Sequence, residues 1–348
     1  AMMLDSSRSF QSADYIKQYI DWLSVHKINI FHWHLTDDQG WRFESKLYPE
    51  FTKKGAWGMA GSALPLHGVR KSWFPADESD GGFYTQEQMR EIVAYAKLRN
   101  VEILPEIDLP GHSRSAVIAY PEIACKGKDN SVDVHGIAVN VWCASREENY
   151  VMMERLLGEV ASIFPFEYIH IGGDEVNHGP WSKCPSCNAF AKTVGLKSGA
   201  HLQGHLTRRL ETICKKLDRK LVGWNEIMGQ GISKDTCIMA WIATGPGYHA
   251  ASIGHPIVMA PGAFTYFDMP HAHGERGHHW AGIVSMEKTY SFDPLANSSL
   301  TPAQLANIHG IEACLWTCYT RSHPEVQKKM GLADLQLARE LVARQASL

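Results

Sequence analysis

The sequence of 348 residues lacks a long hydrophobic run, a strong excess of one charge sign and any internal repeat. A membrane-spanning helix needs about 18 or more consecutive apolar residues, whereas apolar stretches such as Ile28–Leu35 are interrupted by His or Asn. The 34 basic and 37 acidic residues give a net charge of −3, which argues against nucleic-acid and polybasic membrane partners. A hydrophobic fraction of 45% with 20% charged residues is ordinary for a globular protein.

Cysteines are also sparse, because eight in 348 residues do not make a disulfide scaffold. Cys184 and Cys187 have the C-x-x-C spacing of a metal knuckle, but a zinc site usually needs a second such pair, and none exists. Cys125 and Cys143 are candidate partners for them or for each other. A structural zinc ion, a local disulfide and free thiols therefore all stay open.

What the sequence does contain is an alternation of short apolar runs and amphipathic stretches. Near-continuous apolar runs are typical of parallel strands covered on both faces, and eight of them predict an α/β fold, a (β/α)8 TIM barrel. We expect one domain over residues 1–348, with long βα loops at Tyr48–Phe83 and Pro261–Leu300. The expected strands are Met2–Ser6, Ile28–Leu35, Val101–Ile107, Tyr168–Ile171, Lys220–Trp224, Thr236–Ile242, Pro256–Ala260 and Ile311–Trp316. The expected helices are Asp14–His26, Thr85–Arg99, Tyr150–Phe164, His201–Leu217 and Ala333–Ala346.

The start of the chain carries no visible signal peptide. Ala1-Met2 looks like a cloning remnant, so an upstream segment is expected to be missing.

Polar and aromatic residues recur directly after nearly every predicted strand, where the active sites of such barrels lie. The most informative segment is Gly172-Gly173-Asp174-Glu175. Neighbouring strand residues point to opposite faces, so both carboxylates reach one pocket only if the two glycines bend the chain. Adjacent carboxylates repel, so one pKa should rise, as a general acid working near neutrality requires.

The predicted strand ends also carry tryptophans: Trp33, Trp224, Trp241 and Trp316. An indole is a good platform for the apolar face of a sugar ring. Two histidine groups permit another interpretation. The pair His32-x-His34 resembles the metal pair of amidohydrolase barrels, and a second cluster spans His271–His279. The other strand ends lack the lysine and the single histidines of that pattern, so we expect no catalytic metal.

Together the motifs Leu4–Arg8, His32–Arg42, Pro105–His112 and His170–Val176 resemble those of glycoside hydrolase family 20, the β-N-acetylhexosaminidases. The order and spacing match from Arg8 through Trp316. The small α/β domain that usually precedes the barrel is not among these 348 residues, as expected if the start has been trimmed. The resemblance implies release of terminal β-linked GlcNAc or GalNAc with retention, without a cofactor, by attack of the substrate's own acetamido oxygen to give an oxazolinium intermediate.

The same resemblance assigns roles to individual residues. Glu175 is the general acid and then the base, Asp174 orients the acetamide, and Tyr266 binds the acetamide oxygen. Asp37 and His112 form a relay to Glu175. The implied substrate-binding residues are Arg8 at O3 and O4, Trp224, Trp241 and Trp316 as walls, and Asp268 near O4 or O6.

One position departs from the family pattern. The family usually has Glu two residues after the last tryptophan, where it binds O4 and O6, and this chain has Cys318. A thiol is a poor acceptor, so another residue replaces the contact, or the substrate carries an anionic O6 group such as sulfate.

The implied partner is an oligosaccharide or glycoconjugate ending in N-acetylhexosamine, in a secreted or periplasmic setting. The rival hypotheses are a metal-dependent amidohydrolase and a sugar-binding pseudoenzyme. Epimer preference, linkage and oligomeric state do not follow from the sequence.

Overall fold

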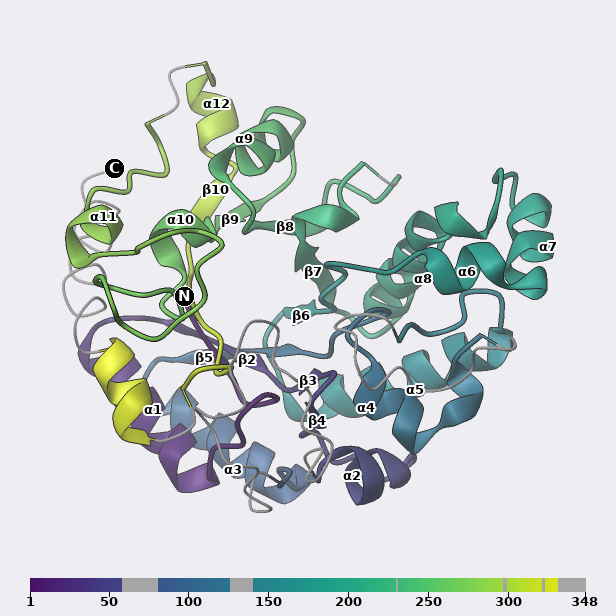
Figure 1. The fold of residues 1–348 in the computed structure, drawn as a ribbon, viewed down its shortest axis with the longest axis horizontal. Coiled ribbons are helices and arrows are strands. Elements are labelled where there is room, and N and C mark those ends of the chain that lie inside the picture. The colour runs from purple at the N-terminus through teal and green to yellow at the C-terminus, as the bar shows by residue number, and fades with distance from the viewer. Residues whose placement is uncertain (58–80, 126–139, 230, 297–298, 321–322, 331–348) are drawn as a thin grey trace.

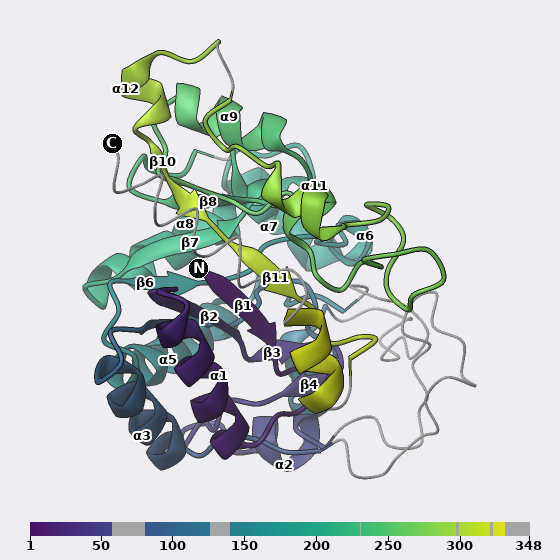
Figure 2. The same cartoon turned by 90° about the vertical axis from the view of Figure 1, so that its left-hand side faces the viewer.

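The computed structural model describes residues 1–57, 81–125, 140–229, 231–296, 299–320 and 323–330. Within them, nine strands form one parallel sheet that curls into a barrel with helices outside it (Figures 1 and 2). The predicted (β/α)8 architecture is confirmed. The strands are β1 (Met2–Asp5), β2 (Ile30–His34), β5 (Glu102–Glu106), β6 (Tyr168–His170), β7 (Lys220–Trp224), β8 (Cys237–Ala240), β9 (Ile257–Met259), β10 (Ile308–Ile311) and β11 (Ala313–Leu315).

The barrel closes through an interrupted last strand. The prediction had one strand at Ile311–Trp316, but β10 pairs with β9 and β11 pairs with β1. Only the buried Glu312 separates the two pieces, and its backbone N–H still donates to Met259 at 2.9 Å. The chain therefore exchanges pairing partners at this residue. The apolar-run criterion missed β10 because His309 and Gly310 interrupt its hydrophobic pattern.

Four of the predicted helices are present as α1, α3, α5 and α8. Ser12 begins α1 by accepting a hydrogen bond from the Tyr15 N–H, and Thr85 and Gln88 form the predicted capping box of α3. The helix predicted at Ala333–Ala346 lies outside the described residues, as does most of the first long loop. The helices are α1 (Ala13–Val25), α2 (Glu50–Gly55), α3 (Gln86–Lys97), α4 (Arg114–Ala119), α5 (Glu147–Ile163), α6 (Gly179–Lys183), α7 (Pro185–Thr193), α8 (Gln203–Lys216), α9 (Thr244–Ser252), α10 (Gly262–Thr265), α11 (Met286–Tyr290) and α12 (Pro302–Leu305).

Several shorter elements lie in the loops. The antiparallel hairpin of β3 (Thr36–Asp37) and β4 (Gly40–Trp41) directly follows β2. Short 3-10 turns lie at η2 (Pro121–Ile123), η3 (Gly199–His201) and η4 (Asn225–Ile227). Across the described ranges, no helix combines the length and hydrophobicity that a membrane crossing requires.

Alternate residues of each strand enter two separate cores. In β2, Phe31 and Trp33 pack on the helix side. On the inner side, His32 forms an ion pair with Glu312, between β10 and β11, and His34 forms one with Glu106 of β5. This alternation follows from the two-residue period of a strand. It gives the sheet an apolar outer face and an inner side that carries ionisable groups beneath the mouth of the barrel.

Candidate active site

The site is organised by a bend directly after β6. Gly172 and Gly173 have φ of +66° and +87°, which glycine adopts without strain. A Cβ at Gly172 would lie 1.9 Å from Asp108 Oδ1, and one at Gly173 would lie 2.5 Å from an Ile227 methyl carbon. No side chain fits at either position. The bend brings the next two residues, Asp174 and Glu175, into the lining of one cavity, as the sequence analysis expected.

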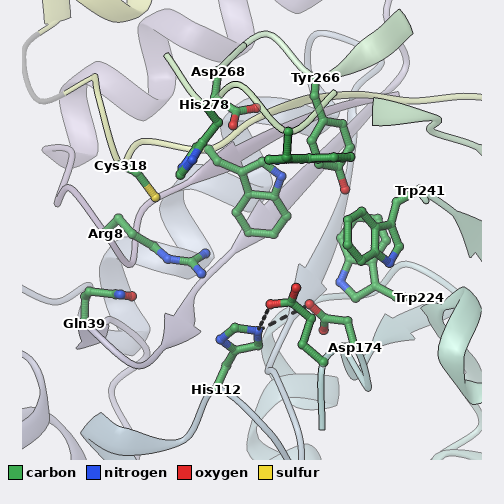
Figure 3. Close-up of a pocket in the computed structure, with 13 residues that line it drawn as sticks. Arg8, Gln39, His112, Asp174, Trp224, Trp241, Tyr266, Asp268, His278 and Cys318 are labelled. Atoms are coloured by element: carbon green, nitrogen blue, oxygen red, sulfur yellow. Dashed lines mark ion pairs between the residues drawn. The ribbon is translucent and has the colours of Figure 1, made fainter. Parts of the chain in front are cut away.

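That cavity has a volume of about 450 Å³, within the usual range for small-molecule sites. All the predicted site residues except Asp37 line it (Figure 3). Asp37 is buried and contacts two of the lining residues. The lining residues are Arg8, Gln39, His112, Asp174, Glu175, Trp224, Trp241, Tyr266, Asp268, His278, Trp280, Trp316 and Cys318.

A chain of ion pairs joins one wall of the cavity to the carboxylate pair. Asp37 lies 2.7 Å from Arg8 Nη2 through one oxygen and 3.2 Å from His112 Nδ1 through the other. The other ring nitrogen of His112 lies 3.5 Å from Asp174 and 3.4 Å from Glu175 (Figure 3). Burial by itself would lower the pKa of His112, but Asp37 and the other carboxylates raise that pKa well above its usual value. The ring is therefore an imidazolium between acidic groups.

The charge of His112 determines which of the nearby carboxyl groups has a raised pKa. The expected rise in pKa does not fall on Glu175, because its hydrogen bond to His112 lowers the pKa of Glu175. It falls instead on two other carboxyls near Asp174. Burial, followed by the charge of Asp174, raises the pKa of Asp108 well above normal and that of Glu226 to about 7. The expected rise in pKa considered only the repulsion between Asp174 and Glu175 and not the charge of His112.

The opposite side of the cavity is aromatic. The rings of Trp241 and Tyr266 are nearly parallel with centroids 6.1 Å apart, and Trp280 meets each of them edge-on at 5.5 Å. Trp224 and Trp316 lie 6.0 Å apart and complete the wall. Trp33 does not belong to this wall. It is fully buried on the helix side of β2, and its indole donates to Ser6 Oγ at 2.9 Å.

A third part of the lining combines Asp268, His278 and Cys318 (Figure 3). Burial raises the pKa of the Asp268 carboxyl to about 8. The histidine cluster predicted at His271–His279 is dispersed. His278 enters the cavity and packs edge-on against Tyr319, His271 lies near the backbone oxygen of Phe267, and His279 is exposed.

Four residues for which the sequence motifs predicted no role also contribute to the site: Gln39, Trp280, Glu226 and Glu106. Glu226 accepts the indole N–H of Trp241 at 3.0 Å, and Glu106 accepts that of Trp224 at 3.0 Å. The available signal for Glu106 was an ionisable residue at the end of an apolar run. Trp280 lies in a long loop and gave no such signal.

The His32-x-His34 pair of the amidohydrolase hypothesis lies outside the cavity lining. His32 is 2.8 Å from Glu312, and His34 is 3.0 Å from Asp37. Glu106 also contacts both rings. These rings therefore form buried ion pairs that connect β2 to β5 and to the residue between β10 and β11.

Comparison with known proteins adds independent evidence. The model of "Glycosyl hydrolase family 20, catalytic domain" matches residues 1–330. A β-hexosaminidase of Vibrio furnissii is 39% identical over 90% of this chain and 52% of its own length. One from Porphyromonas gingivalis is 35% identical over 91% of this chain and 39% of its own length. The chain thus spans about half or less of these relatives.

The solved structures agree. The exo-β-N-acetylglucosaminidase of Vibrio harveyi, in complex with N-acetylglucosamine, has a TM-score of 0.88 at 35% identity. The match covers 98% of this chain and 53% of that one. A Streptomyces plicatus β-hexosaminidase mutant with bound GlcNAc has a TM-score of 0.80 at 27% identity, over 98% of this chain and 62% of that one. This chain belongs to glycosyl hydrolase family 20 and matches the catalytic domain of that family.

Proposed function

We propose that the chain is the catalytic domain of a retaining exo-β-N-acetylhexosaminidase that hydrolyses terminal β-linked GlcNAc or GalNAc. The observation that carries the proposal is the contrast between two adjacent carboxylates in one cavity. The Asp174 side chain is 12% exposed, and its Oδ1 has no hydrogen-bond partner among the described residues, whereas the Glu175 side chain is 50% exposed. One is suited to hold a buried amide, the other to exchange protons at the mouth of the cavity.

Because the carboxylates are neighbours in the chain, they are poorly placed to act from opposite sides of a glycosidic bond, as in most retaining enzymes. The substrate's acetamido oxygen therefore serves as nucleophile. It bonds to C1 as the bond from C1 to the leaving oxygen breaks, and Glu175 gives that oxygen its proton. Glu175 then takes a proton from the water that attacks C1 and reopens the oxazolinium ring.

Asp174 acts on the nitrogen of the same acetamido group. Its unpartnered oxygen accepts the N–H, which gains positive character as the oxygen attacks, so the carboxylate stabilises the transition state more than the bound substrate. Tyr266 donates its hydroxyl to the acetamido oxygen. Burial raises the pKa of Tyr266 well above normal, so the hydroxyl stays protonated as a donor.

His112 keeps Glu175 ionised in the free protein, since its hydrogen bond lowers the pKa of that carboxyl. A sugar seated on the aromatic wall covers the exposed face of Glu175 and removes water from it. Desolvation disfavours the charged form, so substrate binding raises the pKa of Glu175 toward the value that a general acid needs.

The remaining contacts recognise the sugar. Arg8 faces the cavity while Asp5 and Asp37 hold its guanidinium, so it is ready to donate to O3 and O4. The walls of Trp224, Trp241 and Trp316 accept the apolar ring face and the acetamido methyl.

A narrower candidate is a variant specific for O6-modified, for example 6-sulfated, GlcNAc. It is favoured by the lining near Asp268, where Cys318 brings no charge and the pKa of Asp268 is raised to about 8. That region therefore presents two nearly uncharged groups and His278 at neutral pH, without an ionised carboxylate to repel an anion.

The test is release of nitrophenol from β-N-acetylglucosaminide, its 6-sulfated form and the matching β-glucoside, with EDTA present. Cleavage of N-acetylglucosaminides alone would support acetamido assistance, and the ratio of the first two substrates would decide between the candidates. Equal cleavage of the β-glucoside would contradict the mechanism. Binding of N-acetylglucosamine without any turnover would instead indicate a pseudoenzyme.

A further inference from the structure

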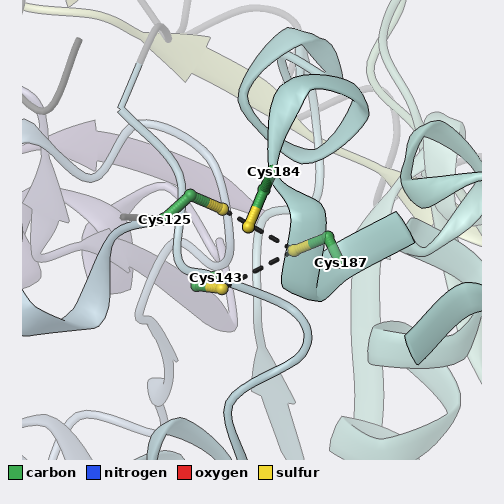
Figure 4. Close-up of side chains that lie close together, drawn as sticks. All are labelled: Cys125, Cys143, Cys184 and Cys187. Carbon is green, nitrogen blue, oxygen red and sulfur yellow. Dashed lines mark hydrogen bonds between the residues drawn. The ribbon is translucent and has the colours of Figure 1, made fainter. Parts of the chain in front are cut away.

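Four buried cysteines meet outside the cavity. Cys125, Cys143, Cys184 and Cys187 are each less than 9% exposed, and their four sulfur atoms all lie within 4.8 Å of one another (Figure 4). They come from two segments that are distant in the sequence. Cys125 and Cys143 belong to the connection between β5 and α5, and the other two belong to the connection between β6 and α8. None of them lines the cavity of the candidate active site.

The distances between the sulfurs fit metal coordination. Cys187 Sγ lies 3.7 Å from Cys125 Sγ and 3.6 Å from Cys143 Sγ, so it has two near-equal neighbours. A disulfide requires about 2.05 Å and a single partner. Four thiolates placed tetrahedrally about zinc at about 2.3 Å are about 3.8 Å apart. The two separations from Cys187 agree with that value, and the other separations do not exceed 4.8 Å.

The surroundings also favour thiolates. Cys184 is the N-cap of α7 and Cys187 lies in its first turn, where the backbone N–H groups and the helix dipole stabilise negative charge. Ser145 Oγ lies 3.3 Å from Cys143 Sγ, in position to donate to that sulfur, and it accepts from the Cys187 thiol at 3.5 Å. Hydroxyl donors of this kind orient and tune metal-bound thiolates.

We propose that these four cysteines bind one zinc ion in a structural site with four thiolate ligands. Four protein ligands leave no open position, so the ion takes no part in hydrolysis. The site instead joins the two loops that carry the candidate catalytic groups. Trp142, which precedes Cys143, donates its backbone N–H to the carbonyl of Pro110, two residues before His112. The indole of Trp181 in α6 donates to the Trp142 carbonyl at 2.8 Å.

The first test is the metal content of the untagged protein, expressed with zinc in the medium and passed through metal-free buffer. Inductively coupled plasma mass spectrometry should find about one zinc per chain. Titration with a mercurial should release that zinc as the cluster thiols react. Absence of bound metal, or intact-mass evidence of a disulfide within the tetrad, would overturn the proposal, and iron in place of zinc would overturn the identity of the ion.

A pair of matched variants locates the ion. The Cys187→Ser variant should lose the zinc and have a lower Tm. The Cys214→Ser variant should keep the zinc and the Tm of the wild type, because Cys214 is equally buried on α8 but lies outside the cluster. Zinc retained in Cys187→Ser would contradict the assignment. If that variant does not fold, replacement of the zinc by cobalt in the wild-type chain tests whether the four thiolates bind a metal. Tetrahedral thiolate coordination gives intense charge-transfer absorption, and its absence would overturn the site.

Discussion

The two halves of the barrel mouth use different means to shape one cavity. The first half, from β1 to β6, supplies Arg8, Asp37, His112 and the carboxylate pair, which are connected by ion pairs before any substrate arrives. The second half, from β7 to β11, supplies an aromatic wall held by packing. Preorganised charges act on the reacting atoms, while aromatic faces mainly add binding surface. Substitutions in the first half should therefore lower kcat, and those of the tryptophans in the second half should raise KM. Tyr266 is the exception in the second half, because its proposed partner is the acetamido oxygen.

Glu175→Gln should have the largest effect, on substrates with poor leaving groups. An alkyl N-acetylglucosaminide needs full protonation of the leaving oxygen, so its kcat should fall by about 10²–10⁴-fold. A dinitrophenyl glycoside, which leaves without a proton, should be much less impaired. Steady-state kinetics on the two substrates measures this difference, with an unchanged Tm as the folding control. Equal losses on both would contradict the role of general acid.

Asp174→Asn should rank second and should impair both leaving-group classes alike, by about 10²–10³-fold in kcat. The reason is that the proposed role of Asp174 is at the acetamido group and not at the leaving oxygen. Steady-state kinetics on the same two substrates measures the two losses in kcat. An active Asp174→Asn variant would be incompatible with acetamido assistance.

Cys318→Glu probes the boundary between the two halves. A restored charged acceptor for a sugar hydroxyl contributes about 1.5–3 kcal/mol, or about 10–100-fold in kcat/KM. We expect that gain on plain N-acetylglucosaminide and a loss on the 6-sulfated substrate. Cys318→Gln is the uncharged control of similar size. Unchanged kinetics in both variants would mean that another residue already makes the contact.

Trp280→Ala should raise KM by about 3–10-fold with little change in kcat, since one edge-on aromatic partner contributes about 1 kcal/mol. Trp280 is 52% exposed, so stability should be retained. Trp57→Ala is the matched control, because Trp57 is 55% exposed and does not line the cavity. A fall in kcat at constant KM would remove the proposed division between the halves.

Asp268→Asn should give the smallest effect, visible as a pH dependence of stability. Burial raises the pKa of Asp268 from 3.8 to about 8, so between these values the folded state holds a proton that the unfolded state has lost. The free energy of unfolding then falls as pH rises through this range. The variant should match the wild type at pH 4, and its Tm should exceed that of the wild type by a growing margin as the pH rises to 8, by about 2–4 °C for each kcal/mol. A constant Tm difference would contradict the raised pKa.

The sequence by itself determined the barrel and most of the candidate site. Strand–helix alternation reports which segments are buried on both faces, and the motif around Asp174 and Glu175 is contiguous, with two glycines that permit the bend. Local patterns of this kind need no knowledge of distant neighbours. The strand-end pattern grouped Trp33 with the three cavity tryptophans, and only the family resemblance left it out. The pattern did not distinguish His278 from the other loop histidines.

Only the tertiary structure decided what depends on distance between remote residues. It set the charge of His112 through Asp37 and the neighbouring carboxylates, and that charge lowers the pKa of Glu175 where a rise within the carboxylate pair was expected. It divided the last strand at Glu312, and it brought Cys125 and Cys143 to the C-x-x-C pair on α7. The energies of Coulombic interactions and of metal–ligand bonds change strongly when the distance changes by a few ångströms. The separation of two residues in the sequence does not give that distance.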